Sequence, residues 1–100
     1  MAKYLLKDAG NNADSGWINV SDCFDRADQQ SGNLYIDGVM SGATVAILAR
    51  PKGSSRSGVT FENGEFTAPD CKQQEFSPDL QIKATTSGGD GSTDVDVWLG

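Results

Sequence analysis

The sequence predicts an all-β domain, either an antiparallel β-sandwich or a jelly-roll-like barrel, and three observations support this prediction. The chain has 100 residues, which is the length of one domain. Its hydrophobic content of 37% is low and it contains 12 glycines, a balance typical of short strands joined by many turns. Apolar and polar residues alternate in about seven or eight short segments that follow one another every 8 to 12 residues or so. Because the alternation is the same in a sandwich and in a barrel, the sequence leaves that choice open.

The first 32 residues contain little periodic apolar sequence. AKYLLK is long enough for one short strand, and DAGNNADSG after it collects turn-forming residues. WINVSDCF is a second candidate strand, built around Trp17, Ile18 and Val20, and the polar DRADQQSGN lacks an apolar stripe. We therefore interpret residues 1–32 as a strand and a loop-rich arm, and residues 33–100 as the sandwich core of a single domain.

Clear period-2 alternation begins with NLYIDG, where Leu34 and Ile36 alternate with polar or amphipathic neighbours. A glycine-bounded turn follows at residues 38–42, and ATVAILAR then supplies the next strand. Two strands with such a short connection predict a hairpin. PKGSSRSG, residues 51–58, is expected to leave the sheet as a loop, because Pro51 cannot donate to a ladder.

The strongest local signal is the pair Asn63 and Gly64 in VTFENGEFTA. Asn-Gly between alternating apolar residues favours a two-residue type I′ hairpin turn, which would pair residues 59–61 with residues 66–68. PDCKQQEFSPD after it is interpreted as a connecting loop, in which Phe76 covers one end of the core.

The last two predicted strands are LQIKATT and TDVDVWLG, separated by the flexible turn SGGDGS. In the final strand, alternation directs one set of side chains to the core and the other to the outer face. The inward set is Val95, Val97 and Leu99, and the outward set is Asp94, Asp96 and Trp98.

Composition disfavours several classes of function. With 14 acidic and 8 basic residues the formal net charge is −6, so phosphate backbones would repel the chain and nucleic-acid binding is not expected. No apolar run approaches the roughly 20 residues that span a bilayer, and the N-terminal segment turns polar after Leu6, too early for a signal peptide. We expect no membrane association and a protein made in the cytosol.

No enzyme activity, metal or cofactor is expected either. The chain has no histidine, so acid-base chemistry would fall to carboxylates such as Asp94 and Asp96, whose alternate spacing is typical of a solvent-facing strand. Calcium could be bound by residues 8–14 or 90–96, but the use of Asp and Asn in turns explains both segments. Cys23 and Cys71 lie far apart in the sequence, and we interpret them as two free thiols in a reducing cytosol.

Trp98 is the first candidate partner-binding residue. It lies out of phase with the core set, and a tryptophan on the outer face of a strand suggests a contact anchor, with Tyr35 as a possible neighbour. The alternative is that a loop such as residues 8–16 covers this face.

Arg50, Lys52 and Arg56 are the other candidate partner-binding residues. They form a basic cluster in a window, residues 38–61, that contains no acid. In an acidic protein this cluster can steer the loop toward an acidic partner surface, including that of another copy. Alternatively, these side chains only keep a loop tip in solution.

The segments GATVAILAR, NGEFTAPD, LQIKATTSG and TDVDVWL, in this order between Leu34 and Leu99, resemble the small β-sandwich proteins of tailed-bacteriophage virions. The likeness covers about two thirds of the chain, and the nearest group comprises the capsid decoration or cementing proteins and the head-tail accessory proteins.

The resemblance implies a non-enzymatic virion structural protein, made in the infected bacterial cytoplasm, that binds the head surface in many copies. Its partners would be the major capsid protein or another virion protein and its own copies, as a homo-oligomer such as a trimer. The N-terminal arm would order on a neighbouring subunit. The alternative is a tail or adhesin-type module that binds a host surface glycan, with Trp98 or Tyr35 stacked on a sugar and Asp94, Asp96 or Asn63 binding its hydroxyls.

Overall fold

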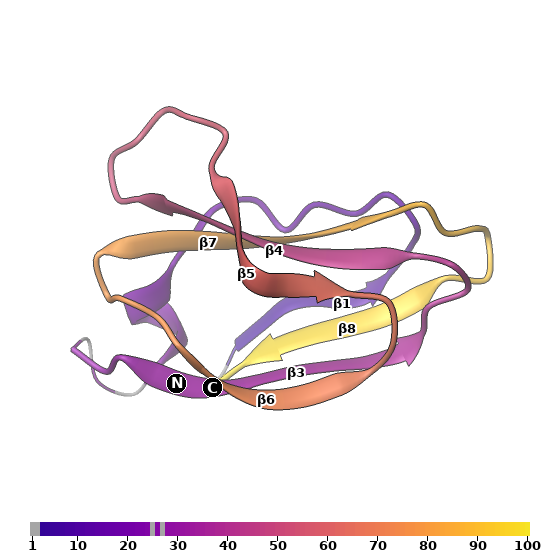
Figure 1. Ribbon diagram of the computed structural model, residues 1–100, viewed down its shortest axis with the longest axis horizontal. Helices are drawn as coiled ribbons and strands as arrows, with labels where there is room; N and C mark the ends of the chain where they lie inside the picture. Colours follow the sequence, from indigo (N-terminus) through magenta and orange to yellow (C-terminus); the bar gives the residue numbers. More distant parts are fainter. Residues whose placement is uncertain (1–2, 25, 27) are drawn as a thin grey trace.

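Two four-stranded antiparallel sheets pack face to face in this computed structural model, which describes residues 3–24, 26 and 28–100. Sheet A has the strand order β1-β8-β3-β6 and forms the lower layer in Figure 1, and sheet B has the order β2-β7-β4-β5 and forms the upper layer. The all-β prediction is confirmed, and the architecture is that of a sandwich. The strands are β1 (Lys3–Ala9), β2 (Ile18–Asn19), β3 (Ser31–Val39), β4 (Thr44–Pro51), β5 (Val59–Phe66), β6 (Asp70–Glu75), β7 (Leu80–Ser87) and β8 (Asp94–Leu99).

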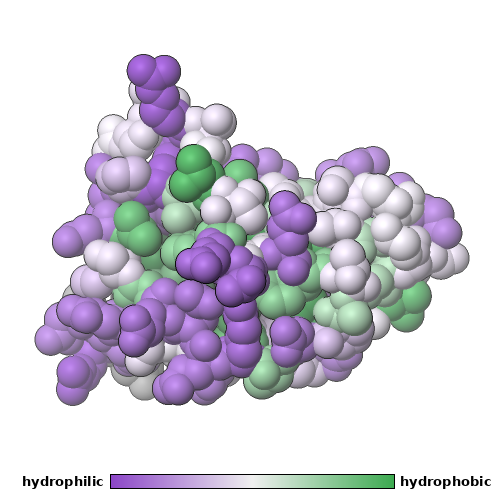
Figure 2. Space-filling view, in the orientation of Figure 1, coloured by the Kyte–Doolittle hydropathy of each residue, from purple (hydrophilic) through white to green (hydrophobic). Residues whose placement is uncertain are grey.

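The core lies between the two sheets and follows the predicted alternation. Val95, Val97 and Leu99 of β8 are fully buried, as predicted, against residues such as Ile47 and Ile82 from sheet B. One contiguous cluster of buried side chains joins both sheets. In Figure 2, hydrophilic residues dominate the lower left of the molecule and the tip of the loop between β4 and β5, and hydrophobic residues appear as separate patches.

The described part of residues 1–32 belongs to the sandwich, so its interpretation as an arm is wrong. β1 pairs with β8 and buries Leu5 and Leu6 in the core. The following loop runs along β7, where the Ser15 N–H donates to the Ala84 carbonyl at 3.0 Å and the Thr86 N–H donates to the Ala13 carbonyl at 2.9 Å. A short 3₁₀ helix, η1 (Val20–Cys23), then buries Val20. Few apolar residues are needed here, because backbone hydrogen bonds to existing strands hold the segment.

The predicted hairpin between β3 and β4 is also wrong, because the two strands lie in different sheets. β3 pairs with β6 and β8, whereas β4 pairs with β5 and β7. The connection uses Ser41 and Gly42 with positive φ values of 49° and 84° to cross between the layers. A short glycine turn can join strands within a sheet or across a sandwich, and alternation does not distinguish the two.

Asn63 and Gly64 form a bulge rather than a hairpin turn. β5 continues through both residues, and its register with β4 shifts between the pairs Ala46–Glu65 and Leu48–Thr60. Asn63 has the positive φ of 56° that the Asn-Gly signal predicts. A Cβ on Gly64 would lie 2.9 Å from the Phe61 carbonyl oxygen, so the bulge requires glycine.

Residues 70–75, predicted to be a loop, form strand β6 at the edge of sheet A. The sequence of β6 does not alternate between apolar and polar residues, because only one edge and part of one face of this strand contact the rest of the protein. The prediction for Phe76 is confirmed: its side chain is 2% exposed and its ring packs edge-on against Phe61, with centroids 5.1 Å apart.

Among the described residues, no helix has the length and apolar character needed to cross a membrane.

Candidate functional site

The outer face of sheet A carries a line of aromatic side chains that crosses the strands. Trp98 of β8 is the direct partner of Tyr4 on one side and of Tyr35 on the other, and Tyr35 is in turn the partner of Cys71 on β6. We call Tyr4, Trp98 and Tyr35 the aromatic row. Directly opposite residues on neighbouring strands project from the same face of a sheet, so the three side chains are adjacent across sheet A.

The aromatic row is open to solvent. Tyr4 is 45% exposed, and Tyr35 and Trp98 are half-buried. Together with Asn33 and Cys71 they line a shallow depression of about 370 Å³. The loop that follows β1 lies along β7 of sheet B, so the alternative in which residues 8–16 cover Trp98 is wrong.

The sequence placed Trp98 and Tyr35 on outer faces, and the structure makes them direct neighbours. The sequence did not predict that Tyr4 and Cys71 lie beside them. Tyr4 stands in the predicted strand AKYLLK, but only the pairing of β1 with β8 brings its ring beside Trp98. Cys71 lies in the segment that was interpreted as a loop.

Carboxylates border one side of the aromatic row. Asp37 and Asp96 are direct partners on β3 and β8, two residues from Tyr35 and Trp98. The Tyr35 hydroxyl donates to Asp37 Oδ2, and the Gly38 N–H donates to Asp37 Oδ1 at 2.8 Å. These two hydrogen bonds lower the pKa of Asp37, with that from Tyr35 the larger cause. Asp37 is therefore ionised at neutral pH beside the aromatic row.

Asp96 is held by β1. Its Oδ1 accepts a hydrogen bond from the Asp8 N–H at 2.8 Å, and its Oδ2 lies 4.0 Å from Lys7 Nζ. Asp8 has a positive φ of 50° and lies where the register of β1 with β8 shifts, between Leu6 and Ala9. The second carboxylate beside the aromatic row is thus fixed by backbone geometry as well as by charge.

The contact between Tyr35 and Asp37 can be tested by titration. The hydrogen bond to Asp37 raises the pKa of Tyr35, because the contact needs the protonated phenol. The contact therefore exists at neutral pH and is lost as the pH rises through the pKa of Tyr35 in the folded state. In a Tyr4→Phe background, where Tyr35 is the remaining tyrosine, Asp37→Asn is expected to lower the midpoint of the phenolate absorbance. An unchanged midpoint would contradict the contact.

The predicted basic cluster lies on the opposite sheet. The Arg50 guanidinium stands 4.3 Å from the centroid of Trp17, its Nε donates to Gln81 Oε1 at 3.0 Å, and its Nη1 donates to the Arg56 carbonyl at 2.8 Å. Lys52 Nζ donates to Ser21 Oγ at 3.2 Å. Arg50 therefore holds the loop of residues 52–58 against sheet B. Pro51, expected to leave the sheet, is instead the last residue of β4 and is paired with Leu80. The five predicted partner-binding residues divide into two groups, with Trp98 and Tyr35 on sheet A and Arg50, Lys52 and Arg56 on the side of sheet B.

Both cysteines are free thiols in different environments. Cys23 is completely buried, and burial raises its pKa, whereas Cys71 is exposed at the end of the aromatic row. A chromogenic disulfide reagent is expected to react with one thiol per chain in the native protein and with the second only after unfolding. Cys71→Ser should remove the fast reaction. Rapid reaction of both thiols in the folded wild type would contradict this assignment.

The segments considered for calcium use their aspartates in turns. Asp14 accepts a hydrogen bond from the Gly16 N–H at 2.8 Å and pairs with Lys83 at 3.2 Å, and Asp90 accepts hydrogen bonds from Ser41 and from the Ser92 N–H. Within residues 3–24, 26 and 28–100, no group of three or more acidic, cysteine or histidine side chains is arranged to hold a metal ion.

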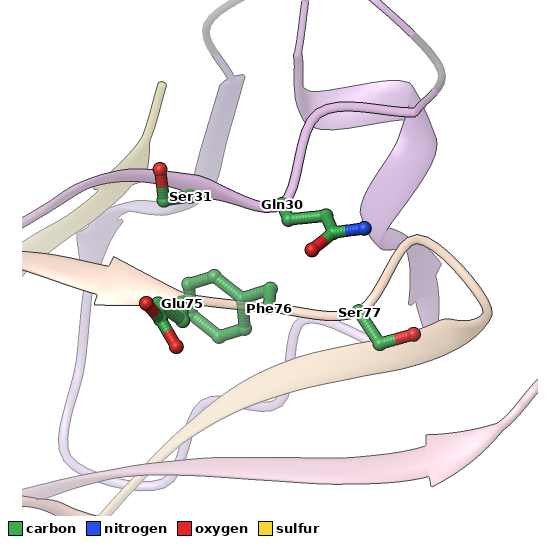
Figure 3. A pocket seen from close by; sticks show the side chains of 5 residues that line it. All are labelled: Gln30, Ser31, Glu75, Phe76 and Ser77. Atoms are coloured by element: carbon green, nitrogen blue, oxygen red, sulfur yellow. The ribbon is translucent and has the colours of Figure 1, made fainter.

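A second depression, of about 470 Å³, opens at the end of the sandwich between Gln30 and Ser77 (Figure 3). It is bridged by the hydrogen bond from the Phe76 N–H to the Gln30 carbonyl, at 2.7 Å. Among the described residues that line it, Glu75 is the one titratable side chain, and its carboxylate points away from Gln30 in Figure 3.

Searches against protein-family models, curated proteins and solved structures found no match in any of the three.

Proposed function

We propose that this protein is a non-enzymatic structural protein of a tailed-bacteriophage virion, one that decorates the head by binding the major capsid protein through the aromatic row. The observation that supports the proposal is the unbroken line of Tyr4, Trp98 and Tyr35 across three strands of sheet A. Trp and Tyr dominate the energetic centres of protein interfaces. An open, nearly flat strip suits a protein surface better than a small molecule, which would need a deeper cavity.

Charge indicates the kind of surface that this face binds. Asp37 and Asp96 border the aromatic row, and the one base in contact with them is Lys7 among the described residues. A partner surface with an apolar centre and a lysine- or arginine-bearing rim would complement this arrangement. A protein of net charge −6 would also approach such a surface faster at low ionic strength.

Binding to heads tests the proposal directly. Heads purified without this protein are mixed with increasing amounts of it and sedimented, and the pelleted protein is expected to saturate at a fixed number of copies. Decorated heads should also resist heat or low salt better than bare heads. If the protein stays in the supernatant at every concentration, the proposal is overturned.

The exposed thiol gives a second test of which face binds. Coupling a bulky maleimide to Cys71 places an obstacle at the end of the aromatic row, while Cys23 stays unmodified in the core. Modified protein should fail to bind heads. Unchanged binding after modification would move the contact elsewhere, and Arg50→Glu with Arg56→Glu would then be the next variant to examine.

Glycan recognition is the second candidate function, and the polar border of the aromatic row favours it. Tyr35 and Trp98 can stack on sugar rings, with Asp96, Asp37 and Asn33 close enough to accept hydroxyl hydrogen bonds. Asn63, considered for this role from the sequence, lies instead in the bulge of β5. Quenching or a shift of tryptophan fluorescence by bacterial surface polysaccharide, without binding to heads, would favour this candidate.

A further inference from the structure

The four edges of the two sheets differ in how well they could pair with another strand. The register of β1 with β8 shifts twice, and β5 is interrupted by its bulge. β2 is only two residues long and is followed directly by η1. β6, in contrast, pairs with β3 over six consecutive residues without a shift and forms the lower margin of Figure 1. Natural edge strands are usually protected by bulges or short length, and β6 has neither.

The backbone of β6 shows which groups face outward. The Cys71 N–H donates to the side chain of its neighbour Asp70 at 2.8 Å, and the Glu75 carbonyl accepts from Gln74 Nε2 at 3.1 Å. Because backbone groups alternate in direction along a strand, Cys71, Gln73 and Glu75 present their N–H and C=O groups to the open edge. Local side chains occupy one group at each end of the strand, which leaves Gln73 at the accessible centre.

Lys72 does not block this edge. A lysine protects an edge strand, even when it points inward, if pairing with an incoming strand would bury its charge without a partner. Here Lys72 Nζ donates to the Asn63 carbonyl at 3.1 Å and lies 5.1 Å from the centroid of Phe66. Its charge is therefore turned toward its own sandwich.

We infer that β6 pairs antiparallel with β6 of a second copy of this chain, with Gln73 opposite Gln73. The two A sheets then join into one continuous sheet about a two-fold axis. In this register Cys71 faces Glu75 and Lys72 faces Gln74, so no like charges are opposed. The Cys71 N–H and the Glu75 carbonyl would exchange their local partners, Asp70 and Gln74, for one another across the interface. Sliding the strands by two residues in one direction would place Lys72 opposite Lys72, and two residues more would place Pro69, which cannot donate, opposite Gln73. Sliding them by two residues in the other direction would leave only residues 73–75 of each β6 paired with the other.

Pairing along β6 leaves the aromatic row uncovered and places the two rows on one face of the joined sheet. Two linked binding faces would strengthen attachment to a repetitive surface through effective concentration. The inference goes beyond the proposed function and does not depend on it, because the pair can form whether or not the aromatic row binds a capsid.

Site-directed cross-linking tests the interface and its register in a Cys71→Ser background. Opposed residues of a hydrogen-bonded antiparallel pair have Cα atoms about 5.5 Å apart, within disulfide range. Gln73→Cys is therefore expected to form a disulfide-linked dimer under mild oxidation. Glu75→Cys is the matched control: the two introduced cysteines would be displaced by four residues along the strands, about 13 Å, and should not link.

Solution mass provides an independent reading. The wild type is expected to sediment at twice the chain mass, Gln73→Ala should remain dimeric, and Gln73→Pro should be monomeric, because it removes an edge N–H without touching the bonds to β3. The cross-linking pair keeps the test decisive if the proline variant does not fold. Three results would each overturn the inference. One is a wild type that stays monomeric up to its solubility limit, and another is equal cross-linking of Gln73→Cys and Glu75→Cys. The third is a dimer of the wild type linked by a disulfide between its native Cys71 residues.

Discussion

Trp98→Ala is expected to weaken binding to phage heads by about 30-fold or more, corresponding to a loss of about 2 kcal/mol at an interface centre. Trp98 stands in the middle of the aromatic row, with Tyr4 and Tyr35 as its direct partners. Its removal interrupts the strip and exposes the flanks of both tyrosines. The amount of protein pelleted with heads, measured over a concentration series, gives the change in apparent Kd.

The fold should survive this substitution, because Trp98 lies outside the buried cluster between the sheets. We expect a loss of about 1 to 2 kcal/mol in the free energy of unfolding, because Trp98 is only half-buried. Trp17→Ala is the matched control: Trp17 is a half-buried tryptophan on sheet B that contacts Arg50 and Lys83. If Trp17→Ala weakens head binding as much as Trp98→Ala, or if Trp98→Ala leaves binding intact, the assigned face is wrong.

Gly38→Ala is expected to destabilise the protein by about 3 kcal/mol or more. Gly38 has a φ of 113°, and a Cβ there would lie 2.2 Å from the Asp94 carbonyl oxygen and 3.0 Å from the Val95 Cα. Both atoms belong to the backbone of β8, which is held between β1 and β3. Neither can move away without breaking the ladder at the centre of sheet A.

Thermal unfolding checks this expectation against a matched glycine. At about 4 to 8 °C per kcal/mol for a domain of this size, Gly38→Ala should lower the Tm by roughly 12 °C or more. Gly10→Ala should change it little, because no atom lies within 4 Å of the added Cβ and its φ is not in the positive region. Similar Tm values for the two variants would show that the backbone of β8 can shift to accommodate a Cβ at position 38, which would contradict this prediction.

The alternation of residues determined which side chains are buried in the strands with clear periodicity. Val95, Val97 and Leu99 could be assigned to the core, and Trp98 to the outer face, because successive side chains of a strand point to opposite sides. The Asn-Gly pair, a second local signal, is typical of the positive φ that Asn63 has, although the hairpin turn predicted from it is wrong. Each of these properties depends on a residue and its nearest neighbours in the chain.

The tertiary structure alone decided which strands are neighbours. Hydrogen bonds between segments distant in sequence decide four features: the crossing from β3 to β4, the use of Asn63 and Gly64 in a bulge, the polar edge strand β6 and the packing of residues 3–24. The aromatic row is a product of the same pairing, because Tyr4, Tyr35 and Trp98 meet only when β1, β3 and β8 form one sheet. Alternation specifies which face of a strand a side chain occupies but not which strand lies beside it, so the aromatic row could not be predicted from the sequence.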